Sequence, residues 1–376
     1  MISKMKGNRN LGDFLNDTFS LVPRLWKTVL PVSLIATAPG SALFALAIGS
    51  MGGWLKSIAA DSASLAEDPA KVFAGLGPFI WLYVLAILAL FLGRSYQKAF
   101  VCLASAEAID GRRSGLRSLA AGAFRPAFAR LAVQDLAIGA VGQALSAAAV
   151  SAILLPFILG KLGAIVQLKD AGSPPASLVA GLIAAYILAL LGGAAAIWWL
   201  RVKTAVAAPS TVLEGRNSIA GAGRSLDLVR GRSWKVFGTM FIVSLIISFG
   251  LGILAGPFTF ATAIPGYFSF MREGASGAKP SMEAIERLLS SLSWTMGLTL
   301  LLNGIVEGSL MPAFLTLLHA DLAEREEKEC RRQKAPALMA PRRRRPAGIA
   351  GRLSRELSAR DRRGEGELDS DSEGLF

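Results

Sequence analysis

The stretch TVLEGRNSIAGAGRSLDLVRGRSWKVF, residues 211–237, joins two long apolar segments and predicts a short basic helix between them. Apolar side chains recur at helical spacing along one face of this helix, at Ile219, Ala222, Leu226 and Val229. Charged side chains take another face, at Arg224, Asp227 and Arg230. A helix of this kind suits a membrane surface. Trp234 and Lys235 then stand where the next apolar segment begins, and both are typical of the headgroup level.

The chain is too apolar for an ordinary soluble protein. Of its 376 residues 53% are hydrophobic, and the mean hydropathy is +0.48. Because a helix of about 20 apolar residues crosses a bilayer, whereas barrel strands are much shorter, an all-α polytopic membrane protein is expected. Six transmembrane segments are predicted, at residues 29–50, 78–105, 131–159, 177–212, 236–270 and 292–319. Residues 1–9 lack the pattern of a cleavable signal peptide, so the first span is expected to be retained.

Several segments exceed one crossing, and either tilt or proline breaks would absorb the surplus. The candidate breaks lie near Pro39, Pro156, Pro209, Pro257 and Pro265. Small residues in the spans, such as Ser248, Gly252 and Gly256, favour close packing between helices inside the protein.

Positive charge alternates between the loops. Residues 1–28, 94–130 and 201–235 carry five, seven and seven Lys or Arg, whereas residues 51–77, 160–176 and 271–291 carry two, two and three. Basic loops stay on the cytoplasmic side of membranes. Both termini are therefore expected in the cytoplasm.

Self-similarity at about 104 residues predicts three related units. Asp110-Gly-Arg-Arg-Ser114 matches Glu214-Gly-Arg-Asn-Ser218, and the cations Lys27, Arg130 and Lys235 open alternate spans at spacings of 103 and 105. Amphipathic surface helices are predicted at residues 11–26 and 116–128, beside the one in 211–237. The membrane domain, residues 1–320, then consists of repeats at about 10–110, 111–215 and 216–320, each with one surface helix and two spans. Residues 321–376 form a polar tail, predicted to begin with a short charged helix.

A candidate intramembrane polar cluster follows from the repeat. Lys98, Lys203 and Glu307 fall at equivalent positions near or within alternate spans. Charged groups in membranes usually face the protein interior or a watery cavity. The whole candidate cluster comprises Arg94, Lys98, Asp135, Lys203, Asn303 and Glu307.

Three interpretations of this cluster are open. A bridge from Glu307 to Lys203 or Lys98 would fix the register of the helices, whereas a polar site between repeats would bind a headgroup or gate movement. Alternatively, the cations extend to the cytoplasmic interface. Asp135 is a further partner for either Arg94 or Lys98.

The basic connectors supply candidate contacts to anionic lipid, at Arg112, Arg113, Arg117, Arg216, Arg224, Arg230, Arg232 and Lys235. Topology alone would also explain these cations. The tail holds a basic segment, Pro341-Arg-Arg-Arg-Arg-Pro346, that suits anionic lipid or, less well, nucleic acid, whereas a solvated tail without a specific ligand is the favoured interpretation. No specific nucleic acid is expected as a partner.

Catalytic and metal-binding patterns do not occur in the sequence. It has a single histidine, His319, and two distant cysteines, Cys102 and Cys330, and it lacks the GxxxxGK[ST], GxSxG and HExxH motifs. No catalytic residue, cofactor or metal ligand is therefore predicted, and His319 is interpreted as an interfacial residue.

The connector resembles that of a large group of prokaryotic six-helix membrane proteins, which is similar to the membrane domain attached to some glycerophosphoryl diester phosphodiesterases. The resemblance lies in Glu214-Gly215, Ala222-Gly-Arg-Ser225, Leu228-Val-Arg-Gly-Arg232, Trp234 and Val236, and in the N-terminal LGDFLNDTFSLVPRLWK. It covers about residues 10–320 and implies the six-helix fold. In the fused enzymes the chemistry lies in a separate soluble barrel, for which the tail here is too short, so no catalytic residue is transferred.

The leading prediction is a non-enzymatic, lipid- or envelope-associated membrane module whose basic surface helices engage anionic lipid. The alternatives are a small transporter or channel lined by the polar cluster, and a membrane scaffold that recruits a soluble protein through its tail.

Overall fold

The computed structural model of the chain describes residues 11–60, 70–112, 115–171, 176–275 and 281–339, and within these ranges it is all-helical, without a strand. Six helices are long and apolar enough to cross a membrane, which confirms the predicted number of spans. They are Pro23–Leu55, Gly75–Ile109, Pro126–Ala152, Ile183–Leu213, Ser233–Glu273 and Met282–Arg331. The chain divides into two compact units, Met1–Glu324 and Arg325–Phe376.

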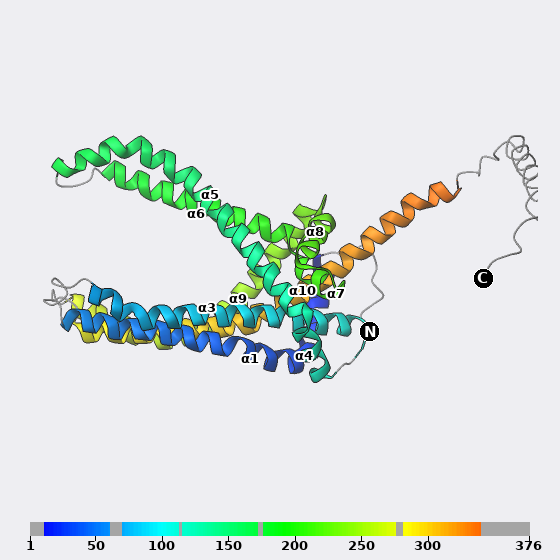
Figure 1. Ribbon diagram of the computed structural model, residues 1–376, viewed down its shortest axis with the longest axis horizontal. Helices are drawn as coiled ribbons and strands as arrows, with labels where there is room; N and C mark the ends of the chain where they lie inside the picture. Colours follow the sequence, from blue (N-terminus) through cyan, green and yellow to red (C-terminus); the bar gives the residue numbers. More distant parts are fainter. Residues whose placement is uncertain (1–10, 61–69, 113–114, 172–175, 276–280, 340–376) are drawn as a thin grey trace, which may run out of the picture. The chain divides into compact units, whose positions relative to one another are not determined.

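Pairs of long helices are separated by short connecting ones (Figure 1). The long helices are α1 (Leu11–Ala60), α3 (Ala70–Ile109), α5 (Pro126–Ala171), α6 (Ala176–Lys203), α9 (Ser233–Ala275) and α10 (Met282–Met339). The short ones are α4 (Leu116–Phe124), α7 (Ala207–Leu213) and α8 (Ser218–Val229). In the second unit α10 continues as a charged helix to Met339, beyond the short extension predicted for the start of the tail.

The N-terminal amphipathic stretch is not a separate surface helix. Residues 11–26 form the first turns of α1, which continues through Pro23, Pro31 and Pro39. Its predicted apolar face is partly buried, since Phe14 and Leu25 are 2% and 8% exposed while Phe19 is 47% exposed. Packing on this face stabilises the helix around Pro23, where the helix propensity of the segment is weak.

Only one of the expected proline breaks interrupts a span. The helices continue through Pro39, Pro156, Pro257 and Pro265, whereas α6 and α7 are separated by a turn just before Pro209. Proline has no N–H to bond the carbonyl four residues earlier, so the preceding turn can open.

The hydroxyl of Ser225 satisfies the backbone at this break. It accepts a hydrogen bond from the Val206 N–H at 3.2 Å and donates one to the carbonyl of Lys203 at 3.0 Å. Ser225 is fully buried in α8, so α8 replaces the helical bonds that the turn lacks. The position of the break thus depends on the connector.

The connectors before α4 and α8 share a turn. Gly111 and Gly215, 104 residues apart, have φ angles of +74° and +65°, a region that favours glycine. The second surface helix is shorter than predicted. It ends at Phe124 because Arg125, which precedes Pro126, is extended, and α5 starts there.

The buried core lies at the connector end of the first unit. One cluster joins α1, α8, α9 and α10 through residues such as Phe14, Leu228, Met240 and Phe314, and a second joins α1, α3, α4 and α5. Elsewhere the long helices expose large apolar side chains, such as Phe249 at 70%. Such surfaces suit contact with lipid.

Glycines allow the helices of this unit to approach closely. A Cβ on Gly93 of α3 would lie 1.9 Å from the carbonyl oxygen of Ala36 in α1, and one on Gly304 of α10 would lie 2.6 Å from Thr37. Backbone cannot give way as a side-chain end can, so Gly93 marks the tightest of these contacts. Close approach supplies the van der Waals contact that holds helices together in lipid.

The Gly93→Ala variant is expected to unfold at a lower temperature than the wild type. Overpacking costs about 1–3 kcal/mol, more than the roughly 1 kcal/mol gained from helix propensity. Thermal melting of the detergent-purified chain measures this difference. Gly250→Ala is the matched control, because a Cβ there meets nothing within 4 Å. Equal melting temperatures for the two variants would refute the close-contact argument.

Candidate functional site

A cleft of ≈ 480 Å³ lies between α3, α5, α6 and α10 in the first unit, and we call it the polar cleft. Five of the six residues of the predicted intramembrane cluster line it: Arg94, Lys98, Asp135, Asn303 and Glu307. Gln97, Gln134 and Arg201 are further polar members of its wall. The structure therefore brings together polar side chains from four candidate spans, α3, α5, α6 and α10.

Asp135 pairs with Lys98, one of the two partners that the sequence offered. The Lys98 Nζ lies 2.9 Å from both carboxylate oxygens, and the Ser95 hydroxyl donates to Oδ2 at 3.0 Å. The side chains are 38% and 20% exposed, so the pair forms part of the cleft surface. Its two charges cancel, which lowers the cost of holding them within a span.

Gln97, next to Lys98 in the sequence, connects α3 to α1 and α10. Its Nε2 donates to the Ser33 hydroxyl of α1 at 2.8 Å and to the Gly304 carbonyl of α10 at 2.9 Å, and the Ser33 and Ser309 hydroxyls are 2.9 Å apart. The side chain is completely buried, and its Oε1 has no hydrogen-bond partner within the described part of the chain. A Cβ on Gly308 would lie 2.6 Å from this amide, so the amide rests against the backbone next to Glu307.

The predicted bridge from Glu307 to Lys203 or Lys98 is not formed. Lys98 is paired with Asp135, and Lys203 donates to the Ser233 hydroxyl at 2.8 Å and lies 5.4 Å from the centroid of the Trp199 ring. Lys203 does not line the polar cleft. Among the described residues Glu307 has neither an ion pair nor a side-chain hydrogen bond. The equivalent positions that the sequence spacing predicted for Lys98, Lys203 and Glu307 therefore do not place either lysine in contact with Glu307.

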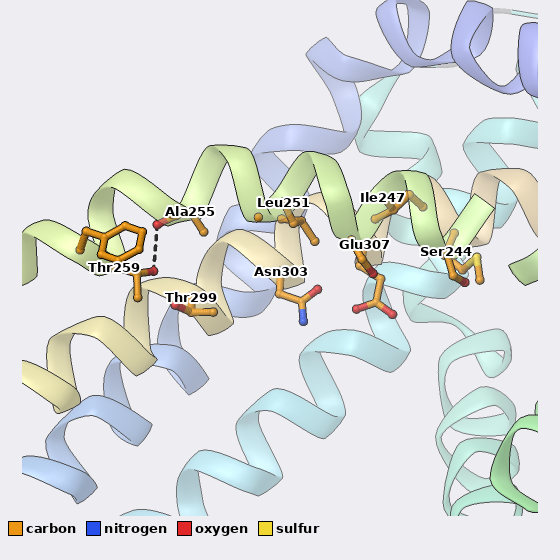
Figure 2. A pocket seen from close by; sticks show the side chains of 13 residues that line it. Ser244, Ile247, Leu251, Ala255, Thr259, Thr299, Asn303 and Glu307 are labelled. Atoms are coloured by element: carbon orange, nitrogen blue, oxygen red, sulfur yellow. Dashed lines mark hydrogen bonds between the residues drawn. The ribbon is translucent and has the colours of Figure 1, made fainter. Parts of the chain in front are cut away.

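Glu307 also lines a second cleft, of ≈ 430 Å³, between α9 and α10, which we call the α9 cleft (Figure 2). Asn303 and Glu307, one helical turn apart, project to the same side of α10 in this view. The Asn303 Oδ1 is buried without a hydrogen-bond partner. The two clefts therefore share an amide and a carboxylate.

The small residues of α9 do not make the close helix contact predicted for them. Ser248, Gly252 and Gly256 line the α9 cleft, and a Cβ on either glycine would meet nothing within 4 Å. Here the small side chains leave room in the cleft.

A second polar constellation lies in the connector, around Glu214. Its carboxylate accepts from His319 of α10 at 2.9 Å and pairs with Arg216 and with Arg224, the latter at 3.6 Å. Burial raises the pKa of Glu214, but the hydrogen bonds from His319 and Arg216 outweigh it, so the pKa lies below its ordinary value. His319 is thus a structural link in the fold, with its side chain only 8% exposed.

The start of α5 is tied to the same connector. The Arg130 guanidinium donates to the Gly215 carbonyl and the Ser218 hydroxyl donates to the Arg130 carbonyl, both at 2.7 Å. Buried Gln134 bonds the Thr211 hydroxyl and the Ser218 carbonyl, each at 3.1 Å. The stretch 211–237 is therefore the junction between α5, α7, α8 and α10.

The candidate lipid-contact cations fall into two groups. Arg216 and Arg224 are held by Glu214, whereas Arg112, Arg117 and Arg230 belong to exposed positions on the connectors. Arg232 and Lys235 stand at the start of α9, and Arg113 lies outside the described residues.

Gln97 and Ser225 are important polar residues that the sequence argument did not select as site residues, and Gln134 was considered only beside Asp135, as a partner for Arg94 or Lys98. Neutral amides and hydroxyls inside spans are common, and only their partners, distant in sequence, reveal their roles. Gln97 and Gln134 did carry one usable signal, since each adjoins a predicted charged residue, Lys98 or Asp135.

No family model, curated protein or solved structure matches this chain. The resemblance to the phosphodiesterase-associated membrane domain stays a prediction that rests on the connector residues.

The Glu214 ion pairs are expected to make stability fall at acid pH. Because the folded-state pKa lies below the ordinary value of 4.5, their stabilisation is complete above about pH 4.5 and is lost as pH falls through the folded-state pKa. At pH 7 the Glu214→Gln variant should be less stable than the wild type by about 1 kcal/mol. The gap in melting temperature should close below about pH 4.5.

The control for this series is Glu283→Gln, whose carboxylate is 77% exposed and which should follow the wild type at each pH. A gap between wild type and Glu214→Gln that stays constant from neutral to acid pH would contradict the role of the carboxylate charge.

Proposed function

We propose that the chain is a non-enzymatic integral membrane protein of a prokaryotic cytoplasmic membrane, which engages anionic lipid through its basic connectors. The observation that supports this most is the exposure of large apolar side chains beside exposed cations on the short helices. Phe124 is 71% exposed on α4, which carries Arg117, and Ile219 is 86% exposed on α8, which is followed by Arg230. Trp234 is 85% exposed at the start of α9.

Side chains of these two kinds on one short helix suit the interface of a bilayer. The apolar groups enter the boundary of the acyl chains, and the guanidinium groups meet phosphates. On α8 the packed face is a different one, since Gly221, Ser225 and Leu228 are buried against the protein. The helix therefore has one face for the fold and another for lipid.

The connector end is proposed to face the cytoplasm, because the loops there carry most of the Lys and Arg of the membrane domain. The proposed three-repeat arrangement is supported by the shared positive φ of Gly111 and Gly215, and by the sequence of short helix and long helix that follows each. In the first proposed repeat, α1 would combine the surface segment with the first span.

A small transporter or channel is the second candidate function, favoured by the polar cleft within the spans. The third prediction, a scaffold that recruits a soluble protein through its tail, rests largely on residues 340–376, which lie outside the described part.

The lipid proposal is tested with the double variant Arg117→Glu/Arg230→Glu. Native mass spectrometry after extraction would compare retained phosphatidylglycerol with phosphatidylethanolamine. Each cation near an anionic surface contributes about 1 kcal/mol, so the ratio should fall roughly tenfold or more. Arg216 and Arg224 are unsuitable positions, because their loss would also disturb Glu214.

Arg287→Glu is the matched control, since this arginine is 66% exposed on α10 and belongs to a sparsely charged loop region. An unchanged lipid ratio in the double variant, or an equal fall in the control, would refute the proposal.

A further inference from the structure

The polar cleft contains more hydrogen-bond acceptors than the protein satisfies. Oε1 of Gln97 and Oδ1 of Asn303 are buried without a partner, and Glu307 has none for its carboxylate among the described residues. All three residues line the cleft. Buried acceptors are costly to leave unpaired, and an uncompensated carboxylate within a span is costlier still.

Among the described residues, the lysines and arginines in or near the cleft do not bond these three unpaired acceptors. Lys98 is neutralised by Asp135, and Lys203 lies away from the cleft against Ser233 and Trp199. Arg94 and Arg201 occupy exposed positions on the cleft wall. The amide nitrogen of Gln97 is occupied by Ser33 and Gly304, which leaves its oxygen as the free end.

The Gln97 amide, from α3, lies against the part of α10 that carries the other two acceptors. Asn303 and Glu307 project from the same side of α10, the Gln97 amide nitrogen donates to the Gly304 carbonyl, and a Cβ on Gly308 would lie 2.6 Å from this amide. Ligands of this set are one carboxylate and neutral oxygens. A single positive charge would balance Glu307, whereas divalent ions are generally held by several carboxylates, and the described residues contain no cluster of three or more His, Cys, Asp or Glu suited to a metal.

We propose that the Glu307–Asn303–Gln97 region of the polar cleft binds a small monovalent cation, either an alkali-metal ion or a primary ammonium group. The carboxylate supplies the charge, and the two amide oxygens replace part of the hydration shell of the cation. Asn303 and Glu307 line both the polar cleft and the α9 cleft, whereas Gln97 lines the polar cleft. This binding site is separate from the connector surface and requires no transport.

The test is thermal melting of the full chain in nanodiscs of phosphatidylcholine, a lipid whose headgroup has no primary amine. Sodium, potassium or ethanolamine chloride would be titrated against choline chloride at constant ionic strength, because choline carries no N–H and is bulky. A bound cation raises the melting temperature with saturation. Saturation by sodium or potassium identifies an alkali-ion site, and saturation by ethanolamine alone identifies an ammonium site.

The Glu307→Gln variant should lose the saturable shift, and Asn303→Ala should need about a tenfold higher concentration of the cation, as expected for one lost ligand. Glu283→Gln, on the exposed part of α10, should titrate as the wild type does. If Glu307→Gln does not fold, the Asn303→Ala shift decides. Equal shifts with choline and the other salts, or a saturable shift that Asn303→Ala leaves unchanged, would overturn the proposal.

Discussion

The packing of the helices at the connector end of the membrane domain depends on the interactions of the Glu214 carboxylate. It binds two arginines of its own connector and His319 of α10, which lies 105 positions along the chain. Because α10 is thereby fixed to the turn at Gly215, and Arg130 of α5 bonds the carbonyl of that same glycine, two long helices meet at the connector. Positive charge at this end thus has two roles: part of it stabilises the fold, and part stays exposed.

The membrane imposes a second constraint, since backbone groups in lipid need partners within the protein. The break between α6 and α7 would leave the Lys203 carbonyl and the Val206 N–H without helical bonds, and the single hydroxyl of Ser225 satisfies both. Gly221, one turn before it, has no room for a Cβ, because Thr211 lies 2.0 Å from that position. Gly221 and Ser225 of the connector therefore have a structural explanation that is independent of any ligand.

Sequence reasoning was strongest where only length and composition mattered. The six spans were predictable because hydropathy reports how much apolar chain is available, whatever it packs against. The course of α1 through three prolines was not, since tertiary packing at Phe14 and Leu25 sustains a helix that local propensity would end. The shorter α4 follows from Pro126, a local signal that was available in the sequence.

The polar cleft also shows that sequence spacing predicts the position of a residue along a span but not the residue that it contacts. The repeat spacing placed Lys98, Lys203 and Glu307 at similar depth, but pairing also depends on the direction in which each helix face points. Lys98 faces α5 and Lys203 faces the start of α9, so each finds a neighbour closer than Glu307. The three positions, spaced as the proposed repeat requires, therefore have three different environments. Among the described residues Glu307, on α10, is the member of this set with neither an ion pair nor a side-chain hydrogen bond.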